Sequence, residues 1–491
     1  MKTALFSLLV LLCSSLSLGA QSDMPPRPQL SSPQLLEDFR LYRSHLEQMQ
    51  PGLYDYYPKD SLDRRFDQLE AQLTASMSDV EFYRLLVTLL PYIANGHNAI
   101  YPPTSYRSAL GQDYPRFPFD VYWDTGQLYV LRNLSGETAI EDGARIRSIN
   151  GQPAAEVLHY IAGLISRDGF NESLPMHTAF RSFKSYYAFL LGTPEYYELE
   201  VENRRGERQS YRVAGLPLPE ISKTRKERYP DHPKHWSQTK DPLYTLQVNG
   251  QVATMKLQSF ATSYIRKRGQ RFKRFFAQSF AEIAERGVEH LIIDLRGNGG
   301  GDPEPTAALF AYLYERDVPF YRDMKMLVNK IPDPQYYDNN ARLVNLFTWT
   351  LVKKNGDHFQ ARGLKKINKP WKIKNRFAGQ VYVLTDPGSF SATGEMTGII
   401  KGYDRATFIG EEAGGNPVAN TSGAMLPLIL PNSQIRTLVP IVQFVMAVDL
   451  VNDGHGVRPD HRLRNSIEDE LAGRDAVMEY TLELIRKNQS K

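Results

Sequence analysis

Cysteine is almost absent from this chain: Cys13 is the only one among 491 residues. It lies in an N-terminal stretch that we expect to be removed, so the mature protein is predicted to lack disulfides, a catalytic thiol and thiolate metal sites. No long block of like charge occurs, and the formal net charge is only +4. This balance gives no reason to expect a nucleic-acid partner. We expect neither a metal ion nor a cofactor.

A long apolar run is missing as well. Lys2 precedes a short apolar stretch at residues 4–12, and the small residues Gly19 and Ala20 follow. This order is typical of a cleaved signal peptide, here residues 1–20. The apolar stretch is too short for a confident membrane span. We therefore expect a periplasmic or secreted protein with no stable membrane insertion after cleavage, and an uncleaved N-terminal anchor is the alternative.

The periodicity of apolar residues changes along the mature chain. A helical period predicts an N-terminal helical domain at residues 28–115, and alternating strands with tight turns predict a small β domain at residues 116–216. The proline-containing stretch 217–242 is interpreted as an irregular linker. Strands and helices alternate over residues 243–465, and a final helix is expected at residues 466–491. Together these patterns of apolar residues predict a multidomain α/β fold.

One segment of the α/β region stands out by its length. Residues 330–374 form a polar insertion that contains an apolar patch at residues 346–351. Long insertions of this kind are often functional lids. A lid over the site and a plain surface excursion are both open from the sequence.

A serine occurs where a buried strand turns into a helix. Residues 381–395 read VYVLTDPGSFSATGE, so that Ser391 lies between a run of β-formers and a helical pattern. A hydroxyl at this junction is exposed, and the free N–H groups of the helix start can stabilise negative charge beside it. Ser391, with Ser389 as the runner-up, is therefore a candidate nucleophile. The alternative is a helix cap.

Glycines follow another predicted buried strand. Residues 291–302 read LIIDLRGNGGGD, and four glycines in this position allow backbone N–H groups to face a cavity. The Gly-Lys-Ser/Thr of a P-loop is missing, and the spacing does not fit the dinucleotide-binding fingerprint. Binding of an oxyanion is therefore favoured over binding of a phosphate.

Two turn-rich segments supply candidates for acid–base chemistry. His97 follows the helical region in the sequence Asn95-Gly96-His97, and imidazole is the usual proton acceptor for a serine. Near the end of the α/β region, Asp453 could orient a histidine and His455 could itself be a base. A surface turn is the structural alternative for this second segment.

Together these segments resemble the S41 family of serine peptidases, which includes the carboxyl-terminal processing proteases and the tricorn core protease. The resemblance rests on residues 291–301, on residues 385–395, and on three further stretches: 143–153, 410–416 and 456–460. It implies a serine-type peptidase with a ClpP/crotonase-like β-sheet spiral core, an N-terminal helical domain that carries His97, and a PDZ-like domain at residues 116–216.

The resemblance also implies roles for single residues. The processing-protease branch has a catalytic lysine where this chain has Asn416, so the Ser–His branch is the better match. There Ser391 attacks the carbonyl, His97 is the base and Asp453 holds the imidazolium. Asp453 is one methylene shorter than the family's glutamate. The backbone N–H groups of Ala392 and Gly300, with Gly299 as a further candidate, are expected to stabilise the oxyanion.

The expected function is therefore an exported serine endopeptidase that acts on peptides or on unfolded or carboxyl-terminal protein segments. A non-catalytic ligand-binding protein on the same core is the main alternative, because a fold does not fix a function. An envelope scaffold that uses the PDZ-like domain is a second one. A metal-dependent hydrolase would need better ligands than His232 and His235, which lie in the predicted linker.

Overall fold

The computed structural model describes residues 27–112, 114–231, 236–314, 318–337, 341–342, 345 and 350–489. The signal segment 1–20 with Cys13 lies outside these residues, as do His232, His235 and residues 346–349 of the apolar patch. Within the described part of the chain, no helix is both long and apolar enough to cross a membrane.

The centre of the molecule is a six-stranded sheet with the order β10-β11-β12-β16-β17-β20. Its strands are β10 (Tyr244–Asn249), β11 (Val252–Leu257), β12 (His290–Asp294), β16 (Gln380–Thr385), β17 (Thr407–Gly410) and β20 (His461–Arg462). All neighbours from β11 to β20 are parallel, whereas β10 is antiparallel to β11. Every residue of β12 is buried, as expected for a parallel strand that is covered on both faces.

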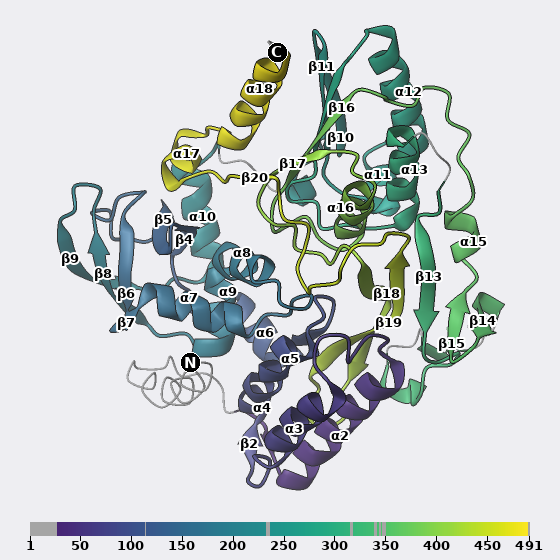
Figure 1. Ribbon diagram of the computed structural model, residues 1–491. Helices are drawn as coiled ribbons and strands as arrows, with labels where there is room; N and C mark the ends of the chain where they lie inside the picture. Colours follow the sequence, from purple (N-terminus) through teal and green to yellow (C-terminus); the bar gives the residue numbers. More distant parts are fainter. Residues whose placement is uncertain are drawn as a thin grey trace.

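Helices pack against this sheet (Figure 1), and one of them is almost completely buried. They are α11 (Thr262–Lys267), α12 (Phe272–Glu285), α13 (Pro303–Leu313) and α16 (Ala392–Gly402). In α16 every residue from Ala392 to Ile400 is buried. Two glycines permit this enclosure: a Cβ at Gly398 would lie 2.2 Å from the Pro417 carbonyl oxygen, and one at Gly394 would lie 2.7 Å from the Gly415 Cα.

A second sheet has the order β14-β15-β13-β19-β18, and β3 pairs with β19 outside that path. Its strands are β3 (Ala99–Tyr101), β13 (Tyr321–Met326), β14 (Val352–Asn355), β15 (His358–Ala361), β18 (Ala419–Ile429) and β19 (Arg436–Met446). The insertion 330–374 therefore contributes β14, β15 and α15 (Leu364–Ile367) to the edge of this sheet.

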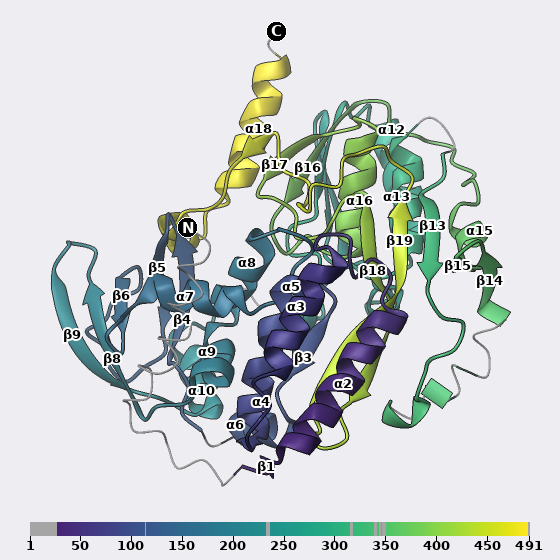
Figure 2. The same cartoon turned by 60° about the horizontal axis from the view of Figure 1, so that its bottom comes forward.

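The N-terminal helices lie beside the second sheet (Figure 2). They are α2 (Ser32–Met49), α3 (Lys59–Glu70), α4 (Asp79–Leu86), the 3-10 turn η1 (Val87–Leu89), α5 (Leu90–Ile93) and α6 (Thr104–Gln112), with β1 (Gln29–Leu30) and β2 (Met77–Ser78) as a small ribbon. A capping box between Ser78 and Glu81 starts α4. Helix α2 packs on β19, which fixes the helical region against the second sheet.

A third sheet, separate from the other two, has the order β4-β5-β6-β8-β9, with β7 on β6 (Figure 1). It comprises β4 (Phe119–Asp124), β5 (Gln127–Asn133), β6 (Arg145–Ile149), β7 (Gln152–Pro153), β8 (Tyr196–Glu202) and β9 (Arg208–Ala214). Three helices accompany it: α7 (Ala154–Gly163), α8 (Ser173–Arg181) and α9 (Phe183–Leu191). We call this unit, residues 116–216, the small domain.

The stretch 217–242 is more ordered than an irregular linker. It contains α10 (Leu218–Arg228) and the short turn η2 (Trp236–Gln238). Pro217 is the N-cap of α10 and Pro219 lies in its first turn, where the missing N–H costs nothing because helix starts leave it unpaired. The prolines that suggested a break therefore start a helix.

The C-terminal segment forms two helices where one was expected. Helix α17 (Ile467–Ala472) ends at Gly473, whose left-handed φ of 65° stops the helix, and α18 (Ala476–Gln489) follows. The N–H of Ile467 donates to the carboxylate of Asp124 on β4 at 3.1 Å. The C-terminal segment thereby ties the small domain to the central sheet.

Candidate active site

The site is built by two loops that leave neighbouring parallel strands. Strands β12 and β16 pair from His290 to Asp294, so their carboxyl ends meet at one edge of the sheet. The loops behind them are joined by hydrogen bonds: the Gly297 N–H donates to Asp386 Oδ1 at 2.8 Å, and the Phe390 N–H donates to the Asn298 carbonyl at 3.2 Å. The glycine-rich loop and the serine loop therefore form one rigid edge.

Ser391 lies at the junction between β16 and α16 and has an uncommon backbone conformation. Its φ is 58° and its ψ is −128°, and it is the N-cap of α16, although its side chain makes no capping bond. A non-glycine residue in such a region costs about 1–3 kcal/mol, and this strain concentrates at functional sites. The same strand–serine–helix turn exposes the nucleophile in other hydrolases.

His97 lies beside this serine. The distance between His97 Nε2 and Ser391 Oγ is 3.0 Å, although 294 positions separate the residues in the chain. The strand β3, which begins two residues after His97, pairs with β19 and brings the imidazole into place. The Phe390 ring stacks on the imidazole with a centroid distance of 4.5 Å and an interplanar angle of 26°.

Burial determines the protonation of this histidine. Desolvation lowers the pKa of His97 to about 4, so the ring is neutral and can accept a proton at neutral pH. The Nδ1 atom is buried and makes no hydrogen bond among the described residues. Within the part of the chain that the structure describes, the serine and the histidine thus form a pair without an acid on the far side of the ring.

Asp453 does not provide that acid in this structure. Its carboxylate accepts the N–H of His455 at 3.1 Å and pairs with Arg458 at 3.0 Å, on the exposed side of the turn. The neighbouring Gly454 carbonyl is held by the Phe170 N–H at 2.7 Å, which fixes the turn. His455 is also not at Ser391, since its Nδ1 lies 3.1 Å from Glu412 Oε1.

The two expected oxyanion donors differ in their surroundings. Ala392 is the first residue of α16, so its N–H has no partner within the helix. The N–H of Gly300 already donates to the Asn298 side-chain carbonyl at 2.9 Å. Gly300 instead allows close approach, because a Cβ there would lie 2.8 Å from both Ala392 N and Ser391 Cβ. Gly299, the further candidate, lies exposed on the same loop.

The runner-up serine is enclosed. Ser389 is fully buried, and its hydroxyl donates to the Leu295 carbonyl at 3.0 Å and lies 3.2 Å from Asp386 Oδ1. Its backbone carbonyl accepts the Gly414 N–H at 2.9 Å. Through these hydrogen bonds Ser389 connects the two loops with the segment 413–415.

Two buried carboxyl groups near the pair were not found from the sequence. Glu395 lies one turn after Ser391 on α16, where it accepts hydrogen bonds from Tyr321 and Asn420, and burial raises its pKa to about 7. Burial likewise raises the pKa of Asp168 to about 6. The apolar pattern of α16 could have revealed Glu395 as an inward-facing position, whereas no local pattern marks Asp168.

Asn416, at the position of the lysine in the Ser–Lys branch, takes part in a neutral polar cluster. Its side-chain amide donates to the Tyr56 hydroxyl at 2.7 Å and to Asn452 Oδ1 at 2.8 Å. In the described part of the chain, no group of three or more His, Cys, Asp or Glu side chains is arranged to hold a metal ion.

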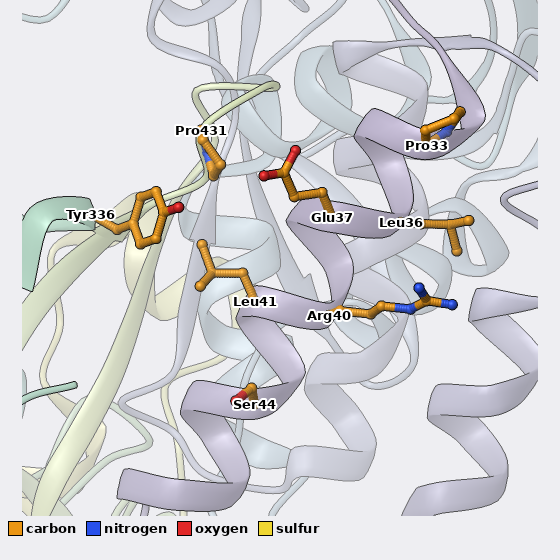
Figure 3. A pocket seen from close by; sticks show the side chains of 8 residues that line it. All are labelled: Pro33, Leu36, Glu37, Arg40, Leu41, Ser44, Tyr336 and Pro431. Carbon is orange, nitrogen blue, oxygen red and sulfur yellow. The ribbon is translucent and has the colours of Figure 1, made fainter. Parts of the chain in front are cut away.

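A cavity of about 620 Å³ lies elsewhere, on the outer face of α2 (Figure 3). It is lined by residues of α2 together with Tyr336 and Pro431, among them Leu36, Glu37 and Leu41. None of the residues of the catalytic pair lines it, so it is separate from the site described above.

Comparison with known proteins gives the class. Residues 251–462 match the model of Peptidase family S41. Mature CPAF complexed with lactacystin is structurally similar, with a TM-score of 0.62 at 14% identity over 92% of this chain and 97% of that one. Mature CPAF alone gives 0.58 at 14% identity, over 91% and 95% of the two chains. No curated protein sequence matches this chain significantly.

Segment 251–462 of this chain therefore belongs to the S41 family of serine peptidases. This confirms the family resemblance drawn from the sequence motifs. The multidomain α/β fold is likewise that of S41 peptidases. As a peptidase, the protein has peptides or proteins as substrates.

Proposed function

We propose that this protein is an exported serine endopeptidase in which Ser391 is the nucleophile and His97 the general base. The observation that carries the proposal is the 3.0 Å distance between Ser391 Oγ and His97 Nε2, at a serine held in a strained turn before a buried helix. A serine that only capped α16 would accept a backbone N–H, and the Ser391 side chain makes no such bond.

The chemistry follows from this geometry. Neutral His97 takes the proton of the Ser391 hydroxyl as the oxygen attacks the scissile carbonyl, and the imidazolium then gives that proton to the leaving amine. The acyl-enzyme is hydrolysed by water through the same base. The N–H groups of Ala392 and Gly299 are the proposed oxyanion donors, since the Gly300 N–H is engaged by Asn298.

The proposed substrates are extended peptides or unfolded and carboxyl-terminal protein segments. The small domain, with its antiparallel sheet and accompanying helix α7, is the proposed PDZ-like unit, and the core is the proposed ClpP/crotonase-like spiral. A PDZ-like unit binds a chain end by strand addition. Export to the periplasm or the exterior rests on the signal pattern of residues 1–20.

The test uses the mature protein and its Ser391→Ala variant, each incubated with casein and with a mixed peptide library. Products are identified by mass spectrometry. We expect internal cleavages with the wild-type protein and none with the variant. Equal product formation by both proteins would remove Ser391 from the nucleophile role, and no products from either would favour a binding protein on this core.

A further inference from the structure

One carboxylate from the small domain reaches the backbone beside the catalytic pair. Asp168 lies between α7 and α8 and is only 4% exposed. Its Oδ1 accepts the N–H of Gly96 at 2.7 Å, and its Oδ2 accepts the N–H of Asn416 at 3.1 Å. Both oxygens of the carboxylate are thus occupied by backbone donors from two other parts of the chain.

The two donors flank the catalytic residues. Gly96 directly precedes His97, so its N–H fixes the turn that carries the base. Asn416 follows Gly415, which packs so closely on the serine turn that a Cβ there would lie 3.1 Å from Ser391 N. A single side chain therefore connects the backbone beside the base with the backbone beside the nucleophile.

The imidazole has few other restraints. Its Nδ1 has no hydrogen-bond partner among the described residues, and Asp453 pairs with Arg458 instead. The ring is held by Phe390 and Ser391, and the His97 N–H donates to Asn95 Oδ1 at 2.9 Å. Because a misplacement of about 1 Å can cost on the order of 100-fold in rate, the backbone restraint at Gly96 is important.

We propose that Asp168 is a positioning residue of the Ser391–His97 pair: its carboxylate clamps the turn of His97 to the loop that packs on Ser391. The proposal rests on the proposed function, because it gives Asp168 a role only in that reaction. An ionised carboxylate accepts both N–H groups, whereas an asparagine would direct its own NH₂ group at one of them.

The surroundings of Asp168 define the expected pH dependence. Two titratable groups, Glu395 and Tyr56, interact with the Asp168 carboxylate, and its charge raises the pKa of both. Burial raises the pKa of Asp168 to about 6 and lowers that of His97 to about 4. As the pH falls through 6, protonation turns one acceptor oxygen into a donor and the clamp weakens before the base is protonated.

The experiment measures the rate at which a tagged fluorophosphonate labels the full-length mature protein between pH 4 and 9. The proteins are the wild type, Ser391→Ala, Asp168→Asn and the control Ser173→Ala. Ser173 is the first residue of α8, five positions after Asp168, and its hydroxyl donates to Asn171 Oδ1 and to the Glu412 carbonyl rather than to Gly96 or Asn416.

We expect labelling of the wild type and none of Ser391→Ala. Asp168→Asn should label about 10- to 100-fold more slowly at pH 8 with an unchanged thermal transition, and Ser173→Ala within about threefold of the wild type. The wild-type rate should fall below a pH of about 6, whereas the residual rate of Asp168→Asn should persist toward a pH of about 4.

The outcomes separate the two proposals. Wild-type labelling that Ser391→Ala abolishes, together with an unchanged rate in Asp168→Asn, would remove the clamp and leave the peptidase proposal standing. No labelling of the wild type would overturn both. If Asp168→Asn does not fold, the wild-type profile alone decides, because a rate that stays constant from pH 8 down to a pH of about 4.5 contradicts the clamp.

Discussion

Replacing Glu395 with glutamine should change how the stability of the protein depends on pH. Glu395 lies on α16 and its carboxyl is fully buried. Burial raises its pKa from 4.5 to about 7, although the hydrogen bonds from Tyr321 and Asn420 oppose the rise. In the unfolded chain the group ionises near pH 4.5. Between these two values the folded protein binds more protons, so its stability decreases as the pH rises through this window.

The size of the effect follows from the difference between the two pKa values. One pKa unit corresponds to about 1.4 kcal/mol, so the buried charge costs roughly 3 kcal/mol above pH 7 and nothing below pH 4.5. Glutamine cannot ionise and retains an acceptor for Tyr321. The Glu395→Gln variant should therefore gain roughly 3 kcal/mol over the wild type on going from pH 4.5 to pH 8.

Differential scanning calorimetry at pH 4.5, 6 and 8 measures this difference. For a core of this size about 1 kcal/mol moves Tm by 2–4 °C, so the Tm of the variant relative to the wild type should rise by about 6–12 °C across the range. Asp168 also titrates in this window, and its charge contributes to the raised pKa of Glu395, so the difference between the two proteins includes this interaction.

A second variant tests the same reasoning in the opposite direction. Tyr321→Phe removes a hydrogen bond that stabilises the ionised carboxylate, so the pKa of Glu395 should rise further and the loss of stability at pH 9 should exceed that of the wild type. A Tm difference between Glu395→Gln and the wild type that stays within about 1 °C from pH 4.5 to pH 8 would refute the argument.

Three further predictions concern the site itself. Gly300→Ala should reduce kcat/KM for a peptide substrate at least about 1,000-fold, because its Cβ would lie 2.8 Å from Ser391 Cβ, whereas Gly297→Ala has open space around it and should fall less than about 10-fold. Phe390→Ala removes the ring that stacks on the imidazole and should lower kcat about 10- to 100-fold with little change in KM. Asp453→Asn should stay within about threefold of the wild-type rate, since this carboxylate pairs with an exposed arginine; a loss of about 1,000-fold would mean that it moves to the imidazole during the reaction.

The position of Ser391 at a strand–helix junction could be predicted because local sequence carries its signal. A strand, a break and a helix place Ser391 at a junction whatever the tertiary fold, and the glycine-rich loop beside it follows from a buried strand in the same sheet. The pairing of His97 with Ser391 needed the family resemblance, since 294 positions separate them.

Other features depend on contacts that no local pattern contains. Asp168 is defined by two backbone donors that lie 72 and 248 positions away, and its neighbours in the sequence give no sign of either. The direction of the Asp453 carboxylate depends on its ion pair with Arg458. It also depends on the hydrogen bond from the Phe170 N–H to the Gly454 carbonyl, which fixes the turn. Pro217 and Pro219 misled the prediction in a different way. They suggested an irregular linker, but at the N-cap and in the first turn of α10 proline is compatible with a helix.

The pairing of β3 with β19 also has a consequence for the order in which the protein is made. The strand that follows the base finds its partner only about 335 positions later, where Ile100 lies opposite Thr437. Contacts so distant in sequence form late in folding. His97 and Ser391 therefore meet only after almost the whole chain has been synthesised, and a nascent or truncated chain that lacks β19 would carry both residues without holding them together and would stay inactive.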